Sequence, residues 1–299
     1  MKPGFLRTAA LLGSLIVGAL VPQATYVAWL IRWLIMGMLY VVFLQTKLSR
    51  EAVRPSHVWL LASNILMGFV GWTAGWLAGG RDLALAGFFC GSTPTATAAP
   101  VIVSFLKGRV DYVIAAFLLT NVIVAALLPA LIPLMVGTAT PNLFHDVLGS
   151  VALVIFVPMA LAWLTRKIHP KATGWPKHLS NVSFGAWVVT LFLITARVSS
   201  FLREHRELPL SLLLEIGALA LLVCAANFAL GRWIGGREFA REASQSLGQK
   251  NTTLTIYLAL TYANPLVALG PTCYVLWHNL WNSWQLHLQA RADERNASA

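Results

Sequence analysis

A lysine stands between two apolar stretches in the segment GQKNTT, residues 248–253, and none of the three residues on either side of it is acidic. Lysine is expensive to place at membrane depth, and its presence there usually marks a functional site. A buried ammonium group is stable only when a partner compensates its charge. We therefore expect Lys250 to meet an anionic substrate.

Two other interpretations of Lys250 stay open at this point. The residue can lie at the membrane surface, if the neighbouring apolar segments end earlier than their hydropathy indicates. It can also form an ion pair with Glu242, which precedes it by eight residues, or with Asp111 or Glu215 from other segments. An ion pair of this kind would be structural and not directed at a substrate.

The composition predicts a helical protein that crosses a membrane many times. Of the 299 residues, 58% are hydrophobic and 11% are charged, and the mean hydropathy is +0.70. Soluble domains carry about 25% charged residues. The net charge of +11 does not indicate nucleic-acid binding, because the basic residues fall in short connections between apolar runs. The three cysteines lie inside apolar runs and are expected to be buried thiols, with no disulfide framework.

Hydropathy and helix-breaking residues predict about ten spans. They cover residues 6–22, 26–46, 57–79, 82–108, 111–137, 144–165, 179–199, 208–233, 238–263 and 265–288. The fourth is interrupted by GSTPTATAAP and the ninth by ASQSLGQKNTT. Ten spans divide into two groups of five that would insert in opposite orientations, as two inverted repeats. Interrupted helices at corresponding positions of such repeats indicate a transport site.

The distribution of basic residues predicts how the chain is oriented in the membrane, and the spacing of glycines predicts how one of its helices packs. Lys and Arg are concentrated in alternate connections, which places both termini in the cytoplasm. The opposite side has only Arg81, Arg197, Arg203 and Arg206 in its connections. Arg32 lies within a span near that side and is expected to reach toward the lipid headgroups. Gly71, Gly75 and Gly79 share one face of the third span and predict close helix packing.

Three stretches resemble the bile acid:sodium symporter family, bacterial branch, over nearly the whole chain. They are LIMGMLYVVFLQTKLS at 34–49, GSTPTATAAPVIVSFLKGRVDY at 91–112, and GQKNTTLTIYLALTYANPLVALGPTCYVLWHNLWNSW at 248–284. The resemblance implies one transporter unit over residues 1–299, with ten helices of which the fourth and ninth are discontinuous and cross. It also implies a panel domain, about 6–46 and 144–199, and a core domain, about 57–137 and 208–288. Transport of a small or amphipathic organic anion, usually driven by two sodium ions, is implied as well.

The chain departs from this family at the positions that bind sodium. The family's glutamine, serine, asparagine, glutamate and glutamine ligands fall on Asn64, Ala99, Pro100, Ser246 and Lys250. The carboxylate is missing, and only Asn64 and Ser246 keep a side-chain oxygen. An ammonium about 4 Å from a cation opposes its binding by roughly 4 kcal/mol at an effective dielectric constant of 20. Two sodium sites of the family type are therefore not expected, and Lys250 takes their place as a tethered cation. Proton coupling and facilitated exchange both stay open.

The resemblance also places residues near the substrate cavity. They are Thr97, Lys250, Asn251, Thr252, His278 and Asn279. A lone buried His-Asn pair more often forms hydrogen bonds between helices. No second His or Cys stands at ligand spacing from His278, so no metal site or other cofactor is expected.

These observations predict a secondary active transporter of an organic anion, working by alternating access. The expected location is the inner membrane of a bacterium, and the expected partners are the anion and the bilayer, with no nucleic acid and no obligate protein partner. A sodium symporter with altered ligands, or a non-transporting sensor on the same fold, remains an alternative. An enzyme is not expected, because no paired acids and no Ser-His-Asp arrangement occur at membrane depth in the sequence.

Overall fold

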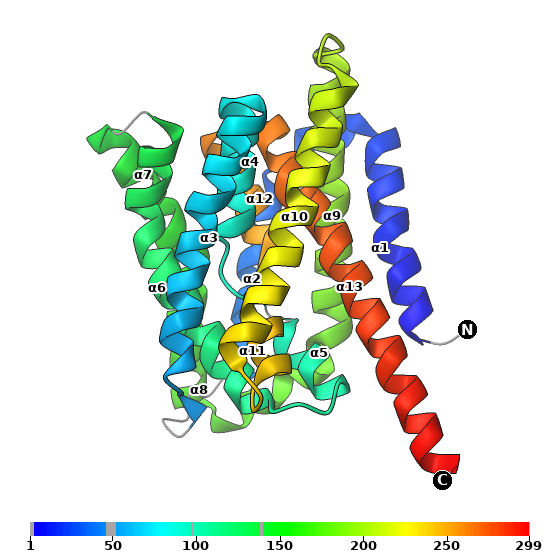
Figure 1. Cartoon of the computed structure of the whole chain (residues 1–299). Helices are drawn as coiled ribbons and strands as arrows, with labels where there is room; N and C mark the ends of the chain where they lie inside the picture. Colours follow the sequence, from blue (N-terminus) through cyan, green and yellow to red (C-terminus); the bar gives the residue numbers. More distant parts are fainter. Residues whose placement is uncertain (1–2, 46–51, 97, 138–139, 299) are drawn as a thin grey trace. The chain divides into compact units, whose positions relative to one another are not determined.

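The computed structural model describes residues 3–45, 52–96, 98–137 and 140–298, and within these residues the protein is all-helical (Figure 1). Thirteen α-helices are joined by turns and by short 3-10 and π segments. The helices are α1 Pro3–Leu20, α2 Leu30–Gln45, α3 Ser56–Gly79, α4 Arg81–Gly91, α5 Ala99–Phe105, α6 Val110–Val136, α7 Pro141–Val151, α8 Val157–Ile168, α9 Trp175–Glu204, α10 Leu210–Gly235, α11 Ala240–Gly248, α12 Thr252–Tyr262 and α13 Pro265–Ser298.

Five helical segments in the described residues are long and apolar enough to cross a membrane. They are Ser56–Gly79, Val110–Val136, Pro141–Ile168, Asn181–Glu204 and Leu210–Gly235. Each has at least 24 residues, or about 36 Å at 1.5 Å per residue, against about 30 Å of hydrocarbon core. The helices follow the order of the predicted spans. The arrangement of ten spans as two inverted repeats stays a prediction.

The predicted spans 26–46 and 144–165 differ from the observed helices at places where proline occurs. The predicted span 26–46 begins as an α-helix only at Leu30, because Pro22 starts a separate 3-10 helix, Pro22–Val27. The predicted span 144–165 contains a π-helical turn, Ala152–Phe156, which ends two residues before Pro158. Proline has no backbone N–H to donate to the preceding turn, and π turns occur where the ordinary hydrogen-bond ladder is disturbed.

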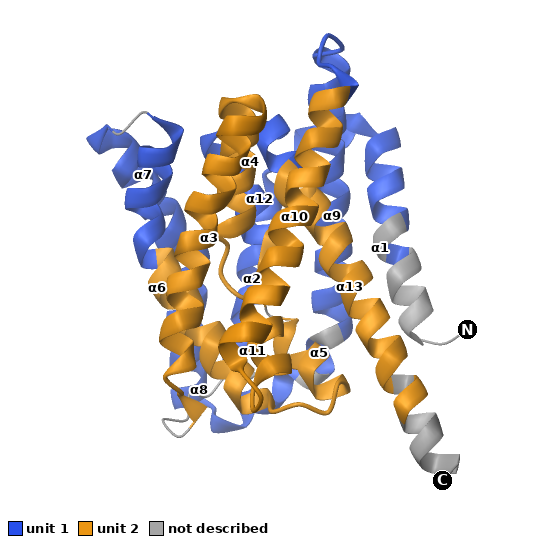
Figure 2. Cartoon of the chain, in the orientation of Figure 1, with its two compact units in different colours: residues 1–46, 126–210, 253–269 blue, residues 47–125, 211–252, 270–299 orange. Residues whose placement is uncertain are grey.

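The chain divides into two compact units, shown in different colours in Figure 2. Unit 1 contains residues 1–46, 126–210 and 253–269, and unit 2 contains residues 47–125, 211–252 and 270–299. In unit 1, helices α1 and α9 lie together, and the Ser199 hydroxyl donates to the Ala19 carbonyl at 2.8 Å. The panel and core domains expected from the family resemblance stay a prediction.

In unit 2, α3 and α4 pack at backbone distance. A Cβ added to Gly71 would overlap the carbonyl oxygen of Gly87, and one added to Gly87 would overlap that of Gly71. At Gly75 the obstacle is the carbonyl of Leu83. The predicted close helix packing through Gly71 and Gly75 is confirmed.

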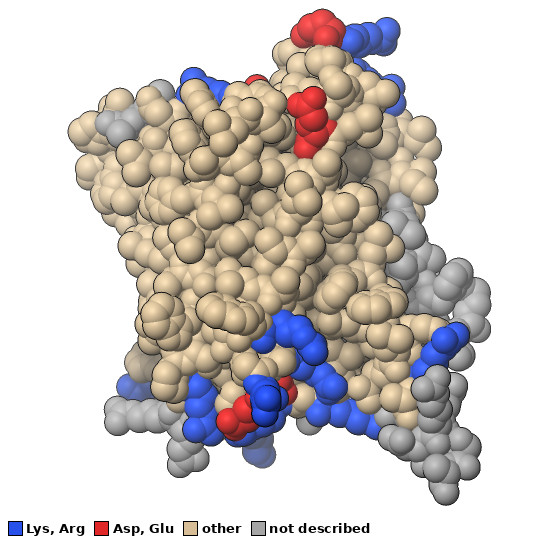
Figure 3. Space-filling view, viewed as in Figure 1, with Lys and Arg blue, Asp and Glu red and all other residues tan. Residues whose placement is uncertain are grey.

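Charged side chains are confined to the helix ends over the part of unit 2 that faces the viewer in Figure 3. Lys and Arg gather at the end where α11 lies, and the middle of these helices is covered by uncharged side chains. This distribution is the one expected of helices that cross a hydrocarbon layer, because charge is costly at its centre.

Gly71→Ala is expected to destabilise the protein by about 1–3 kcal/mol, the usual cost of overpacking a tight contact. The measurement is thermal unfolding in detergent, where the melting temperature should fall by several degrees. Gly37→Ala in α2 is the matched control, since nothing lies within 4 Å of its added Cβ. An equal melting temperature for the two variants would contradict the α3–α4 packing described above.

Candidate functional site

The two interrupted segments are hydrogen-bonded to each other through their backbones. One lies between α4 and α5, the other between α11 and α12, and Thr95 and Lys250 form an antiparallel bridge. The Ala96 N–H donates to the Gln249 carbonyl at 2.7 Å, and the Asn251 N–H donates to the Pro94 carbonyl at 2.8 Å. The interruptions predicted from the sequence are present at these places.

Side chains from outside α11 donate hydrogen bonds to two of the carbonyl groups at its end. The last four carbonyls of an α-helix have no partner within it. The Thr95 hydroxyl donates to the Ser246 carbonyl at 2.6 Å, and the Tyr274 hydroxyl donates to the Gly248 carbonyl at 2.8 Å. Asn227 donates to the Tyr274 oxygen at 3.2 Å. The end of α11 is thereby fixed without a water-exposed cap.

Thr120 and Asn121 of α6 hold the first interrupted segment. Asn121 Nδ2 donates to the Thr95 carbonyl at 2.9 Å, and Thr120 Oγ1 accepts the Thr95 N–H at 3.2 Å. Both residues are buried. The sequence analysis did not single them out, although two adjacent polar residues inside the apolar run FLLTNVIV are a signal that could have identified them.

Lys250 is only 1% exposed, so it does not lie at the surface of the described structure. Its Nζ donates to the Gly91 carbonyl at 3.0 Å. Gly91 is the last residue of α4, and the C-terminal end of a helix carries a partial negative charge. Lys250 therefore bonds to the negative end of α4.

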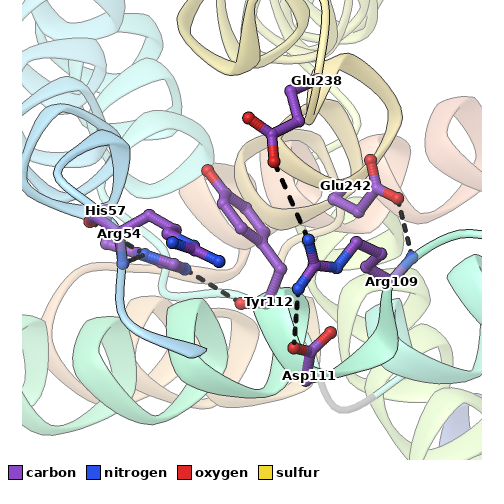
Figure 4. Close-up of polar contacts among 7 residues, drawn as sticks. All are labelled: Arg54, His57, Arg109, Asp111, Tyr112, Glu238 and Glu242. Atoms are coloured by element: carbon purple, nitrogen blue, oxygen red, sulfur yellow. Dashed lines mark hydrogen bonds and ion pairs between the residues drawn. The ribbon is translucent and has the colours of Figure 1, made fainter. Parts of the chain in front are cut away.

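Two of the three acidic residues considered as partners for Lys250, Glu242 and Asp111, have other contacts. Glu242 is 6% exposed, and its Oε1 accepts the Arg109 N–H at 2.7 Å (Figure 4). Asp111 lies 3.5 Å from the Arg109 guanidinium. Among the described residues, no carboxylate forms an ion pair with Lys250 within 4 Å.

Arg109 belongs to a charged and aromatic cluster that joins α3, α6 and the start of α11. Figure 4 shows its guanidinium between Asp111 and Glu238, which lies 3.8 Å away. The same guanidinium lies 5.2 Å from the centre of the Phe239 ring, and that ring stacks on Tyr112. His57 of α3 contacts the Tyr112 carbonyl through Nε2 at 2.9 Å. Glu242 is thus part of a structural cluster and is not available to Lys250.

The family's sodium-ligand positions have different surroundings. Asn64 is fully buried and donates to the Thr93 carbonyl at 2.9 Å, while its Oδ1 has no hydrogen-bond partner among the described residues. The Ser246 hydroxyl donates to the Glu242 carbonyl of its own helix at 2.8 Å. Ala99 and Pro100 are the first two residues of α5 and supply no side-chain oxygen.

The residues expected near the substrate are only partly brought together. Asn251 and Thr252 are buried and directly follow Lys250, and Thr97 lies outside the described residues. His278 is buried with its ring 5.7 Å from that of Tyr274, and Asn279 donates to the Val275 carbonyl of its own helix at 2.7 Å. No described hydrogen bond joins His278 or Asn279 to the segment around Lys250.

A chain of carboxamide groups links α11 to α13 and was missed by the sequence analysis. Gln245 donates to Asn282 at 3.1 Å and to Gln285 at 2.8 Å, and Asn282 donates to Gln249 at 2.7 Å. In α13 it is therefore Asn282, and not Asn279, that contacts the second interrupted segment. No group of three His, Cys, Asp or Glu in the described part of the chain could hold a metal ion.

Long apolar helices are typical of a helical membrane protein, and two interrupted segments paired at a buried lysine are a feature of transporters. Residues 46–281 match the SBF-like CPA transporter family, and the chain belongs to this family, which is related to the bile acid:sodium symporter family. The protein is therefore a multi-pass membrane transporter, and its family is not one of enzymes. No curated protein matches the chain.

Thr95→Val is expected to destabilise the protein by about 1–3 kcal/mol, because the buried Ser246 carbonyl loses its donor. The measurement is the melting temperature in detergent. Thr73→Val is the control: Thr73 is exposed, and its hydroxyl donates to the Phe69 carbonyl within α3. Should both variants unfold at the same temperature, the Thr95 hydroxyl would not hold the two segments together.

Proposed function

We propose that the protein is a secondary active carrier of a small or amphipathic organic anion, and that Lys250 is the fixed cation that meets this anion. The proposal is carried by a single observation: Lys250 is 1% exposed, and its described partner is an uncharged carbonyl group. A buried ammonium that faces no carboxylate leaves a charge for an anionic ligand to neutralise.

The helix that follows Lys250 supports the same role. α12 begins at Thr252, two residues after Lys250, and the N-terminal end of a helix favours anions through its free N–H groups and its dipole. The proposed substrate site consists of Thr97, Lys250, Asn251 and Thr252, while His278 and Asn279 belong to it on the family resemblance alone.

Alternating access completes the proposal. The panel helices, about 6–46 and 144–199, would move against the core helices, about 57–137 and 208–288, in a fold of ten spans arranged as two inverted repeats. Both termini would lie in the cytoplasm of a bacterium, with the chain in the inner membrane. The concentration of Lys and Arg in alternate connections supports this orientation.

Coupling to sodium is the second candidate. It is favoured by one observation: the buried Oδ1 of Asn64 has no hydrogen-bond partner among the described residues. Sodium requires several oxygen ligands, and Ala99 and Pro100 supply none from their side chains. The ammonium of Lys250 also opposes a bound cation nearby. We therefore favour transport without sodium, either coupled to protons at Lys250 or facilitated.

Lys250→Gln is expected to reduce uptake of small carboxylates into proteoliposomes by at least about tenfold, since an ion-paired hydrogen bond to the substrate is lost. Sodium, potassium and a proton gradient are varied independently for both proteins. Arg206→Gln is the control, because it removes an exposed positive charge. Uptake by Lys250→Gln equal to that of the unaltered protein would remove the tethered cation from the mechanism.

Sodium is expected to leave the melting temperature of the detergent-solubilised protein unchanged relative to an equal concentration of potassium. The physical reason is that a ligand stabilises a folded protein only when it binds the folded state. A rise in melting temperature with sodium alone that disappears in Asn64→Leu would instead establish the sodium-coupled alternative.

A further inference from the structure

A second group of cationic side chains faces a pocket that lies wholly within unit 1. The pocket has a volume of about 440 Å³, within the range of small-molecule sites. Its lining comes from α2, α9, α12 and the turn that precedes α2, and consists of Ala28, Trp29, Ile31, Arg32, Trp33, Arg197, Tyr257, Leu260 and Thr261. Two guanidinium groups and three aromatic rings therefore share one concave surface.

Neither arginine of the pocket forms an ion pair with an acid among the residues that the structure describes. Arg32 Nε donates to the Tyr257 hydroxyl at 2.9 Å, and an Arg197 Nη2 contact to the Leu260 carbonyl measures 3.5 Å. Both partners are uncharged. Among the described contacts, Asp146, Glu204 and Glu207 of the same unit form no ion pair with either arginine. Two like charges on one pocket repel each other, so an anion bound between them gains energy from both.

Arginine suits this role because its planar group can donate two parallel hydrogen bonds to a carboxylate or phosphate. With Nε of Arg32 bound to Tyr257, the two Nη groups of that side chain have no described partner. Arg32 was expected to reach toward the lipid headgroups. In the structure Tyr257 holds it beside the pocket, with its guanidinium 5.6 Å from the centre of the Tyr257 ring.

The aromatic residues indicate the remainder of the ligand. Trp29 is 64% exposed and Trp33 is 56% exposed, so both present apolar surface beside the two cations. Tryptophan at such a place contributes apolar contact area together with one N–H donor. A ligand that satisfies the whole pocket has an anionic head and an apolar body.

We propose that this pocket binds an amphipathic organic anion, a carboxylate or phosphate joined to an apolar group, between Arg32 and Arg197. The anion comes either from solution or from the headgroup of an anionic lipid, and both share this chemistry. The site does not depend on Lys250 being the transport site. It is nevertheless connected to that region, since α12 begins two residues after Lys250 and carries Tyr257 and Leu260 to the pocket.

The test measures binding of radiolabelled benzoate by equilibrium dialysis to the full-length protein in phosphatidylcholine nanodiscs. Arg32→Gln and Arg197→Gln are each expected to weaken binding by at least about tenfold, because each removes charged hydrogen-bond donors. Arg206→Gln, which removes an exposed arginine of the same unit, should change binding by less than about twofold. Benzamide, which has the same shape without the charge, should not compete.

The binding measurements have outcomes that would contradict an anion site between Arg32 and Arg197. Equal weakening by Arg206→Gln, or competition by benzamide, would overturn the proposal, since binding would then not require the two arginines or an anion. Tyr257→Phe removes the hydroxyl that holds Arg32 but keeps its guanidinium, so it should weaken binding less than Arg32→Gln does. A larger loss in Tyr257→Phe than in Arg32→Gln, with an unchanged melting temperature, would contradict the proposal. The comparison is repeated in the Lys250→Gln background, which removes benzoate bound at the proposed transport site. Arg32→Gln and Arg197→Gln should weaken binding there as well, so failure of this site is distinguished from failure of the transport proposal.

Two further arms identify the source of the anion. Phosphatidylglycerol added to the nanodiscs should displace benzoate if the pocket takes a lipid headgroup, and this displacement should disappear in Arg197→Gln. Unchanged benzoate binding in phosphatidylglycerol assigns the pocket to a soluble anion. Both results support an anion site between the two arginines, whereas displacement that persists in Arg197→Gln contradicts it.

Discussion

Unpaired backbone groups are the constraint on which the rest of this structure depends. At membrane depth no water is present to bond a free N–H or carbonyl, so irregular backbone must find partners within the protein. Here two irregular segments supply each other's partners, through Ala96 with Gln249 and Asn251 with Pro94. The tight α3–α4 contact and the buried residues of α6 and α13 serve the same end, because they hold these segments in register.

The sequence predicted the irregular segments well, because their signal is local. Small residues, proline and polar residues interrupt an apolar run, and the helices do end at Gly91 and Gly248 and restart at Ala99 and Thr252. Lys250 was equally visible, since a charge in such a run stands out by composition alone. The packing role of Gly71 followed from its spacing along one helix face.

Partners distant in the sequence could not be predicted in the same way. Lys250 and Gly91 are 159 residues apart, and no local pattern encodes which carbonyl the ammonium meets. Which asparagine of α13 contacts the second interrupted segment depends on the rotation of this helix about its own axis. Asn282 donates to Gln249, whereas Asn279 donates to a carbonyl of its own helix. A family resemblance indicates which positions in the sequence have a role, whereas the contacts made at those positions depend on how this chain packs.

The bond between Lys250 and the Gly91 carbonyl also has a consequence for binding strength. An anion that takes Lys250, as proposed, must first break this bond, and hydrogen bonds to charged groups contribute about 1.5–3 kcal/mol. That loss weakens the anion's affinity by roughly 10- to 100-fold relative to an uncommitted ammonium. The carbonyl recaptures the lysine when the anion leaves, so the same bond hastens release. Weak binding of the anion, together with a ligand-free state stabilised by this hydrogen bond, suits a transporter, because a transporter must release its substrate.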